Sequence, residues 1–181
     1  MMNTKVWVLR LFHRAHRDKR VTSHLVLAAR ALGARGLFFC GQYDKSIMET
    51  IEKVNDMWGG DFKVVYIQDY IKLIKSWKKE NGEVIHLTMY GIPVTKVIDD
   101  VRKSRKKKLI VVGGEKVPGI IYKLADWNIS VTNQPHSEIS ALAIFLHELF
   151  KGEELNLEFR NAKMRIIPQA KGKKVIRLND C

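Results

Sequence analysis

The sequence is poor in cysteine, in acidic residues and in long hydrophobic runs. Its two cysteines, Cys40 and Cys181, lie far apart and form no CxxC pair, which argues against a zinc site and against a disulfide framework. The longest apolar runs, such as Ala141 to Leu146, are shorter than the ~20 residues that a membrane-spanning helix needs. The apolar stretch from Val6 to Leu9 is broken by Arg10, too early for the hydrophobic core of a signal peptide. We therefore expect a cytoplasmic protein without a membrane partner.

Familiar catalytic signatures are absent as well. The sequence has no GxxxxGK[ST] loop, no GxGxxG turn, no nucleophile elbow, no zincin helix and no kinase signature. A Rossmann-type nucleotide enzyme would carry GxGxxG after its first strand, whereas the corresponding turn here is rich in arginine. His136 has no Cys or His partner at a zinc-binding spacing, so we expect no metal.

Positive charge is in large excess. The chain has 32 Lys and Arg against 19 Asp and Glu, a net charge of +13. Six of the seven residues from Arg102 to Lys108 are basic, but the excess is larger than this run alone can supply. A field of this sign attracts polyanions, and nucleic acid first among them. The run from Arg102 to Lys108 is a candidate for phosphate contacts.

The hydrophobic pattern of the 181 residues is typical of one α/β domain. Short runs rich in Val, Ile and Phe predict strands that are buried on both faces. Apolar stripes with helical spacing, from Tyr70 to Trp77 and from Ile139 to Leu149, separate them, with Pro135 expected in the first turn of the second stripe and Gly152 after its end. A parallel sheet with helices on both faces follows. The predicted strands are Val6 to Leu11, Gly36 to Cys40, Lys63 to Ile67, Val84 to Met89, Leu109 to Val112 and Trp127 to Val131.

The pattern changes near the C-terminus. Leu155, Leu157 and Phe159 alternate with polar residues, and further short apolar groups flank a turn rich in Gly and Lys. We predict a small antiparallel β extension rather than a second globular domain. The boundary is placed between a domain of residues 1–152 and an extension of residues 153–181.

Loops that follow the predicted strands are the first places to look for a ligand site, because parallel sheets bind ligands beyond the carboxyl ends of their strands. The first loop, residues 10–20, holds five Arg or Lys and two His. Arginine side chains suit phosphate oxygens, although a solvated loop with local salt bridges would have the same composition. A second loop contains Gly113 and Gly114 and leads to Pro118, which is expected to open a helix. Glycines allow close approach to a ligand, but many such turns are plain connections.

Two further loops lie at the ends of predicted strands. Residues 131–138 hold Asn, Gln, Ser and Glu at a strand-to-helix junction, which suits recognition of a polar small molecule, although capping preferences alone favour ordinary helix capping. Residues 87–91 form the other. From the residues alone, the chain is a basic α/β protein with a small-molecule pocket at its later strand ends. A non-catalytic RNA-binding module stays open, and cofactor titration would discriminate it from an enzyme.

Four motifs occur in an order that resembles a known family. They are HRxxRDxRxxxH from His13, HLTMYG from His86, GGEKVP from Gly113 and NQPHSE from Asn133. Together they are similar to motifs of the archaeal tRNA ribose 2′-O-methyltransferases that act on cytidine 56 of the T-loop. That family belongs to the SPOUT superfamily, whose methyl donor is S-adenosylmethionine. The resemblance extends over residues 5–178. SPOUT enzymes acting on a different RNA nucleotide are the main alternative, because a cofactor pocket alone does not select the substrate.

The resemblance implies a deep trefoil knot, a homodimer with an active site shared between subunits, and S-adenosylmethionine bound in the knotted loops. The residues implied in cofactor binding are Leu87, Gly113, Gly114, Glu115, Lys116, Val117, Val131, Thr132, Asn133, Gln134, Pro135, His136, Ser137 and Glu138.

The resemblance also implies roles for the first motif. Arg20 is expected to assist the reacting ribose 2′-hydroxyl, with Asp18 orienting it, while Arg14 and Arg17 are expected to contact RNA phosphates. Because an arginine is a poor base, we expect Arg20 to stabilise developing negative charge and a phosphate or water to take the proton. His24 is a rival base.

The sequence departs from the family pattern at three places. Phe12 stands where a glycine is more common, Gly114 where alanine is more common, and Val131-Thr132 where Ile-Gly is more common. The change at Gly114 is expected to be mild, whereas Phe12 and Thr132 are expected to affect the loop conformations.

Overall fold

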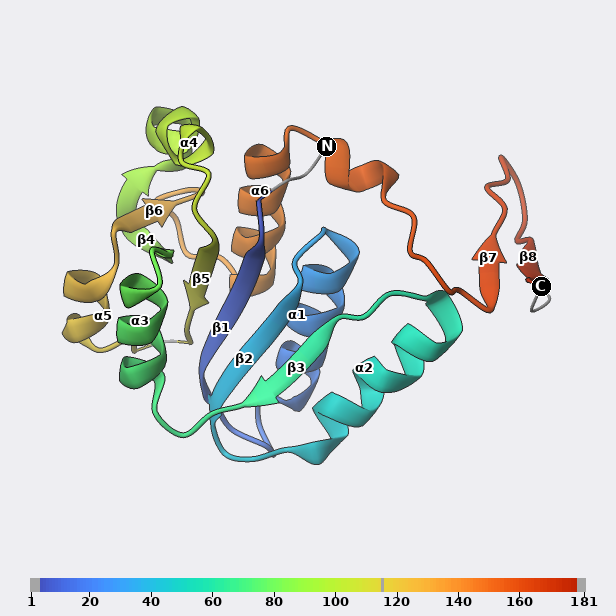
Figure 1. Ribbon diagram of the computed structural model, residues 1–181, viewed down its shortest axis with the longest axis horizontal. Helices are drawn as coiled ribbons and strands as arrows, with labels where there is room; N and C mark the ends of the chain where they lie inside the picture. The colour runs from blue at the N-terminus through green and yellow to red at the C-terminus, as the bar shows by residue number, and fades with distance from the viewer. Residues whose placement is uncertain (1–3, 115, 179–181) are drawn as a thin grey trace.

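The computed structural model describes residues 4–114 and 116–178 and contains a six-stranded parallel sheet (Figure 1). The predicted strands all form, and their order across the sheet is β3-β2-β1-β5-β4-β6. Because all strands are parallel, their carboxyl ends share one edge of the sheet, where ligands of such folds bind. The strands are β1 (Val6–His13), β2 (Gly36–Gly41), β3 (Lys63–Tyr66), β4 (Glu83–Pro93), β5 (Lys108–Val112) and β6 (Trp127–Ser130).

Helices cover both faces of the sheet, as the pattern predicts. One face packs on α1 (Lys19–Ala31), α2 (Lys45–Trp58), α4 (Val94–Lys103) and α6 (Glu138–Phe150). The other packs on α3 (Tyr70–Lys79) and α5 (Gly119–Leu124). Side chains of β1 alternate between the two layers: Val6 and Val8 join the α1 and α6 side, and Leu9 and Leu11 join the α3 and α5 side.

The prediction that the strands are buried on both faces is confirmed for the central strands but is wrong for β3. Every residue of β5 is buried, whereas Lys63 and Val65 of β3 are exposed. The difference arises because β3 pairs only with β2 and forms one edge of the sheet. A short Val-rich run does not distinguish an edge strand from a central one.

The start of α6 differs from the sequence prediction at Pro135. The helix begins at Glu138, and Ser137 is its N-cap, whose hydroxyl accepts a hydrogen bond from the Ser140 amide at 3.2 Å. A serine cap satisfies an amide that would otherwise lack a partner, so the helix starts there. The placement of Pro135 in the first turn is therefore wrong, since it lies in the preceding loop. At the other end, Lys151 and Gly152 both adopt positive φ and stop the helix as expected.

The C-terminal extension is a short helix followed by an antiparallel hairpin. A 3₁₀ helix, η1 (Glu153–Asn156), contains Leu155, so the strand-like alternation that starts at this residue is misleading. Strands β7 (Met164–Ile166) and β8 (Val175–Arg177) then pair antiparallel, which confirms the predicted extension in its later part. The hairpin projects beyond the end of α2 (Figure 1). No helix within residues 4–114 and 116–178 has the length and apolar character to cross a membrane.

Candidate active site

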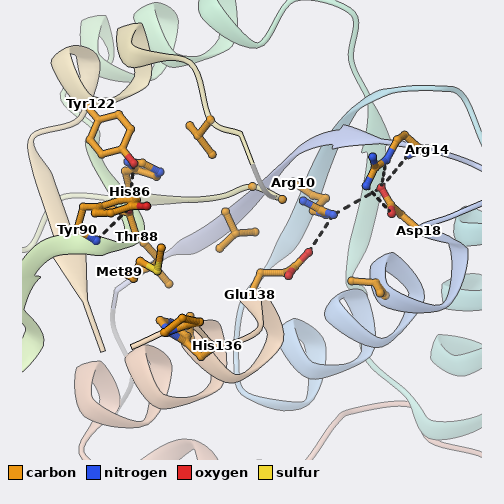
Figure 2. A pocket seen from close by; sticks show the side chains of 18 of the residues that line it. Arg10, Arg14, Asp18, His86, Thr88, Met89, Tyr90, Tyr122, His136 and Glu138 are labelled. Carbon is orange, nitrogen blue, oxygen red and sulfur yellow. Dashed lines mark hydrogen bonds and ion pairs between the residues drawn. The ribbon is translucent and has the colours of Figure 1, made fainter. Parts of the chain in front are cut away.

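A cavity of about 490 Å³ opens at the carboxyl ends of the central strands (Figure 2). We call it the main cavity. Four segments that are distant in the sequence line it: the end of β1 with the start of α1, the end of β4, the loop after β5, and the start of α6. These segments carry the four motifs that the sequence singles out, and the fold brings all four together.

Arg10 forms the buried floor of the cavity. In β1, Arg10 lies two residues after Val8, so its side chain points to the same face of the sheet as Val6 and Val8, the face covered by α1 and α6. The residue is only 2% exposed. One terminal nitrogen lies 2.9 Å from Oε1 of Glu138 and 3.9 Å from Oδ2 of Asp18 (Figure 2). The other donates to the Leu11 carbonyl at 3.1 Å. A guanidinium this deeply buried requires such partners, and they join the first motif to the last.

Arg14 holds Asp18 through a bidentate pair of hydrogen bonds. The Arg14 Nε atom donates to Oδ2 at 2.9 Å, and Nη2 donates to Oδ1 at 3.1 Å. The hydrogen bonds from Arg14 hold the pKa of Asp18 below its usual value. Asp18 is therefore a carboxylate with fixed orientation and weak basicity, which suits a group that positions arginines.

The residues predicted in the first motif fall into two sets. Arg14, Arg17 and Asp18 line the main cavity. Arg20 is exposed on α1, outside the described residues that line the cavity, and His24 is exposed on the same helix. The partners of Asp18 are Arg14 and Arg10, where the sequence interpretation pairs it with Arg20.

His86 closes the opposite end of the cavity in a polar cluster. Its Nδ1 lies 2.9 Å from Oδ1 of Asn128, and its ring packs perpendicular to that of Tyr122 at a centroid distance of 4.6 Å. The Asn128 amide nitrogen donates to the Tyr122 carbonyl, so the oxygen faces His86 and accepts from Nδ1–H. The Nε2 atom therefore carries a lone pair, and burial lowers the pKa of His86 and keeps the ring neutral. This cluster lies across the cavity from Arg10 and Asp18 (Figure 2).

The two glycines after β5 differ in their surroundings. A Cβ atom added to Gly113 would lie 2.4 Å from Cγ2 of Val117, whereas one added to Gly114 would meet only the guanidinium of Arg10 at 3.9 Å. Neither glycine has positive φ. Close packing therefore requires glycine at position 113, while position 114 has room for alanine, which explains why Gly114 is a mild departure. Glu115 lies outside the described residues.

Some of the remaining predicted cofactor residues line the main cavity, and others lie outside its lining. Within the described chain, Leu87, Gly113, Gly114, Val117, Pro135, His136 and Glu138 line the main cavity. Lys116 lines an adjoining cavity of about 400 Å³, and Val131, Thr132, Gln134 and Ser137 lie outside the lining. Asn133 supports the loop, because its amide nitrogen donates to the Met89 carbonyl at 2.6 Å and to Ser130 Oγ at 3.1 Å. The last loop is thus tied to the end of β4.

Phe12 takes a conformation that glycine adopts more readily. Its φ is +55°, in the left-handed region, at the place where the pairing of β1 with β2 shifts register. Its ring packs edge-on against Tyr70 at 5.4 Å, which partly offsets the strain. The departure at Phe12 therefore keeps a glycine-like backbone and adds an aromatic contact.

The basic run from Arg102 to Lys108 lies mostly in internal ion pairs. Arg102 pairs with Asp99 at 2.7 Å, Lys103 with Asp100 at 2.8 Å, and Lys107 with Glu80. Lys108 is fully buried against Glu83. Of the six basic residues, Arg105 and Lys106 have no ion pair among the described residues. In the described part of the chain, no group of His, Cys, Asp and Glu is arranged to hold a metal ion.

The fold is that of the SpoU and TrmH RNA methyltransferases, as the SPOUT prediction requires. An AdoMet-bound rRNA methyltransferase from Sinorhizobium meliloti superposes with a TM-score of 0.63 at 18% identity, over 82% of this chain and 57% of that one. The SpoU methyltransferase AviRb from Streptomyces viridochromogenes, in complex with AdoMet, superposes with a TM-score of 0.57 at 15% identity, over 82% of this chain and 57% of that one. The chain thus spans a little over half the length of these two enzymes.

Sequence relatives narrow the class to one family. A family model described as tRNA ribose 2′-O-methyltransferase, aTrm56, matches residues 58–176. The tRNA (cytidine(56)-2′-O)-methyltransferase of Methanothermobacter thermautotrophicus is 51% identical over 97% of this chain and 98% of its own. The protein of the same name from Hyperthermus butylicus is 49% identical over 95% of this chain and 92% of its own. The chain belongs to the aTrm56 family of tRNA ribose 2′-O-methyltransferases.

Proposed function

We propose that the protein transfers a methyl group from S-adenosylmethionine to the ribose 2′-oxygen of cytidine 56 in tRNA. The observation that carries the proposal is the convergence of the four family motifs on one cavity at the carboxyl edge of the sheet. Relatives about half identical over nearly the whole chain bear the name of this activity. We expect the enzyme to work in the cytoplasm.

The residues of the main cavity fit the methyl donor. Its volume of about 490 Å³ lies within the ~300–1,000 Å³ typical of small-molecule sites. Leu87, Val112 and Val117 offer apolar contacts, and two buried polar atoms without a hydrogen-bond partner among the described residues, Nε2 of His86 and Nε of Arg10, belong to lining residues. Bound there, the cofactor supplies an electrophilic methyl group on a positively charged sulfur. The loops at Leu87, at residues 113–117 and at residues 131–138 would hold it.

The arginines of the first motif serve the RNA. Arg14 and Arg17 line the cavity and suit the phosphates next to the target ribose. Asp18 holds Arg14 in place through two hydrogen bonds. The 2′-hydroxyl must lose a proton as its oxygen bonds to carbon, and neither an arginine nor a carboxylate of lowered pKa is a good base for it. Arg14, Arg17 and Asp18 are thus unsuited to accept this proton, and we assign that role to a phosphate oxygen or to water.

Arg20 takes part through a second subunit. Its side chain does not line the main cavity of its own chain, so we assign its action on the developing alkoxide to the cavity of a partner subunit. A homodimer with a shared active site meets this requirement. A mixture of Arg20→Ala protein with a variant that cannot bind the cofactor should then recover activity, because one hybrid site contains both intact parts.

The direct test is mass mapping of a tRNA transcript after incubation with the protein and isotope-labelled methyl donor. The expected result is one added methyl group on the nucleotide at position 56. A methyl group on a different nucleotide would assign another RNA substrate. Binding of tRNA without any transfer would make the protein a non-catalytic RNA-binding module, and either result would contradict the proposal.

A further inference from the structure

The C-terminal hairpin holds an unusual share of the positive charge. Residues 160–178 contain seven Lys and Arg and no Asp or Glu, while the whole chain has a net charge of +13. We define the basic hairpin as residues 164–177, from the start of β7 to the end of β8. About half of the net charge thus lies in and next to a segment with only two three-residue strands.

The cations of the hairpin differ from those of the run from Arg102 to Lys108. In that run, four of the six basic side chains are paired with carboxylates. By contrast, four exposed cations of the hairpin have no ion pair among the described residues. They are Lys171, Lys173, Lys174 and Arg177. Like charges held close together repel one another, so this arrangement favours a polyanionic partner.

The structural role of the hairpin does not account for these cations. All residues from Pro168 to Arg177 are exposed, so the tip contributes nothing to the core. The hairpin is anchored at its base by the Lys163 amide, which donates to the Met57 carbonyl in α2 at 3.0 Å. The Leu178 amide donates to the Lys163 carbonyl at 2.8 Å and joins the two ends of the hairpin. The cross-strand pair of Ile166 and Val175 stabilises the strands themselves. The base therefore holds the hairpin in place, while the side chains of its tip are all exposed and available to contact a partner.

We propose that the basic hairpin binds the sugar–phosphate backbone of the RNA substrate at a distance from the reacting ribose. The hairpin docks at the end of α2, near the amino ends of the strands, whereas the main cavity lies at their carboxyl ends (Figure 1). Contacts there contribute affinity and no chemistry, so losing them raises KM for tRNA and leaves kcat unchanged. The inference rests on the proposed function, because it assumes an RNA substrate.

A matched pair of variants tests this role. The hairpin variant changes Lys171, Lys173, Lys174 and Arg177 to alanine. The control removes the same charge from exposed helix positions, Lys53 on α2 and Lys72, Lys75 and Lys79 on α3. tRNA affinity is measured from 50 to 200 mM salt for both variants and for the unmodified protein. Calorimetry with S-adenosylmethionine reports on the fold and on the main cavity.

If the four cations contact phosphates, the slope of log affinity against log salt falls by about 3 in the hairpin variant. The unmodified protein then loses roughly 60-fold more affinity than that variant across this salt range. The control keeps the original slope, and cofactor binding is the same in all three proteins. Equal slopes in the hairpin variant and the control would overturn the proposal. An unchanged slope with an altered oligomeric mass would instead assign the hairpin to contacts between copies of the chain.

The proposed function can fail independently. If the unmodified protein takes up no methyl donor, the enzymatic assignment fails, while the salt slopes still report whether the hairpin binds RNA.

Discussion

Alanine at position 113 should damage the cofactor site, and alanine at position 114 should not. An added Cβ at Gly113 would lie 2.4 Å from Cγ2 of Val117, far inside van der Waals contact, whereas the nearest atoms to an added Cβ at Gly114 are 3.9 Å away. Valine has few alternative rotamers, so Val117 cannot move aside cheaply and the loop must shift. Overpacking of this kind costs about 1–3 kcal/mol. Where that cost is expressed in binding, the dissociation constant for S-adenosylmethionine rises about 5- to 150-fold.

Isothermal titration calorimetry measures the difference directly. We expect Gly113→Ala to bind the methyl donor much more weakly than Gly114→Ala, whose affinity should stay close to that of the unmodified protein. Adding Val117→Ala to Gly113→Ala removes the clashing methyl group and should restore part of the loss. Equal affinities for the two single variants, or a greater loss at position 114, would show that the packing of Gly113 on Val117 does not shape the site.

Three further predictions concern stability. Arg10→Met leaves the Glu138 carboxylate without its guanidinium partner and should lower the free energy of unfolding by about 2–4 kcal/mol in urea titrations. The double variant Arg10→Met/Glu138→Met should lose less than the sum of the two single variants, and additive losses would refute the coupling. Phe12→Gly and Phe12→Ala both delete the ring that contacts Tyr70, but the glycine variant should be about 1 kcal/mol more stable because φ is +55° at this position, and equal thermal stability would contradict that conformation. Burial lowers the pKa of His86, so the unfolded chain binds more protons than the folded one just below pH 6.5, and stability should decline as the pH falls through that range. His86→Gln should reduce the decline in the urea midpoint between pH 7.5 and 5.5, and an unchanged decline would exclude His86 as a source.

Much of the fold can be predicted from short apolar runs and helical stripes, because these patterns report burial directly. All six strands form where the sequence predicts them. Errors arise where a local signal has two meanings. The run of β3 is as apolar as its neighbours but lies at an edge. Pro135 suits a first helical turn, yet the Ser137 cap starts the helix later. The alternation beginning at Leu155 looks like a strand but starts in a 3₁₀ helix.

The site is predictable in outline and less so in its contacts. Motif order identifies the loops that meet at the main cavity, because those loops follow parallel strands. The roles of Arg10 and His86 are not predicted, since a single polar residue in a buried strand does not reveal its partner. Arg10 pairs with Glu138, which lies far away in the sequence, and His86 pairs with Asn128. Their signal is the polar side chain itself, in a strand predicted to be buried on both faces, where an apolar side chain is expected. The knot and the homodimer stay predictions.

Methyl uptake by two tRNA transcripts that differ in one atom tests the central claim most directly. One transcript carries cytidine at position 56, and the other carries 2′-deoxycytidine there. With labelled S-adenosylmethionine in excess, the first should accept one methyl group per molecule and the second none, because only the first has the hydroxyl that is modified. Equal incorporation into both transcripts would show that the methyl group goes elsewhere.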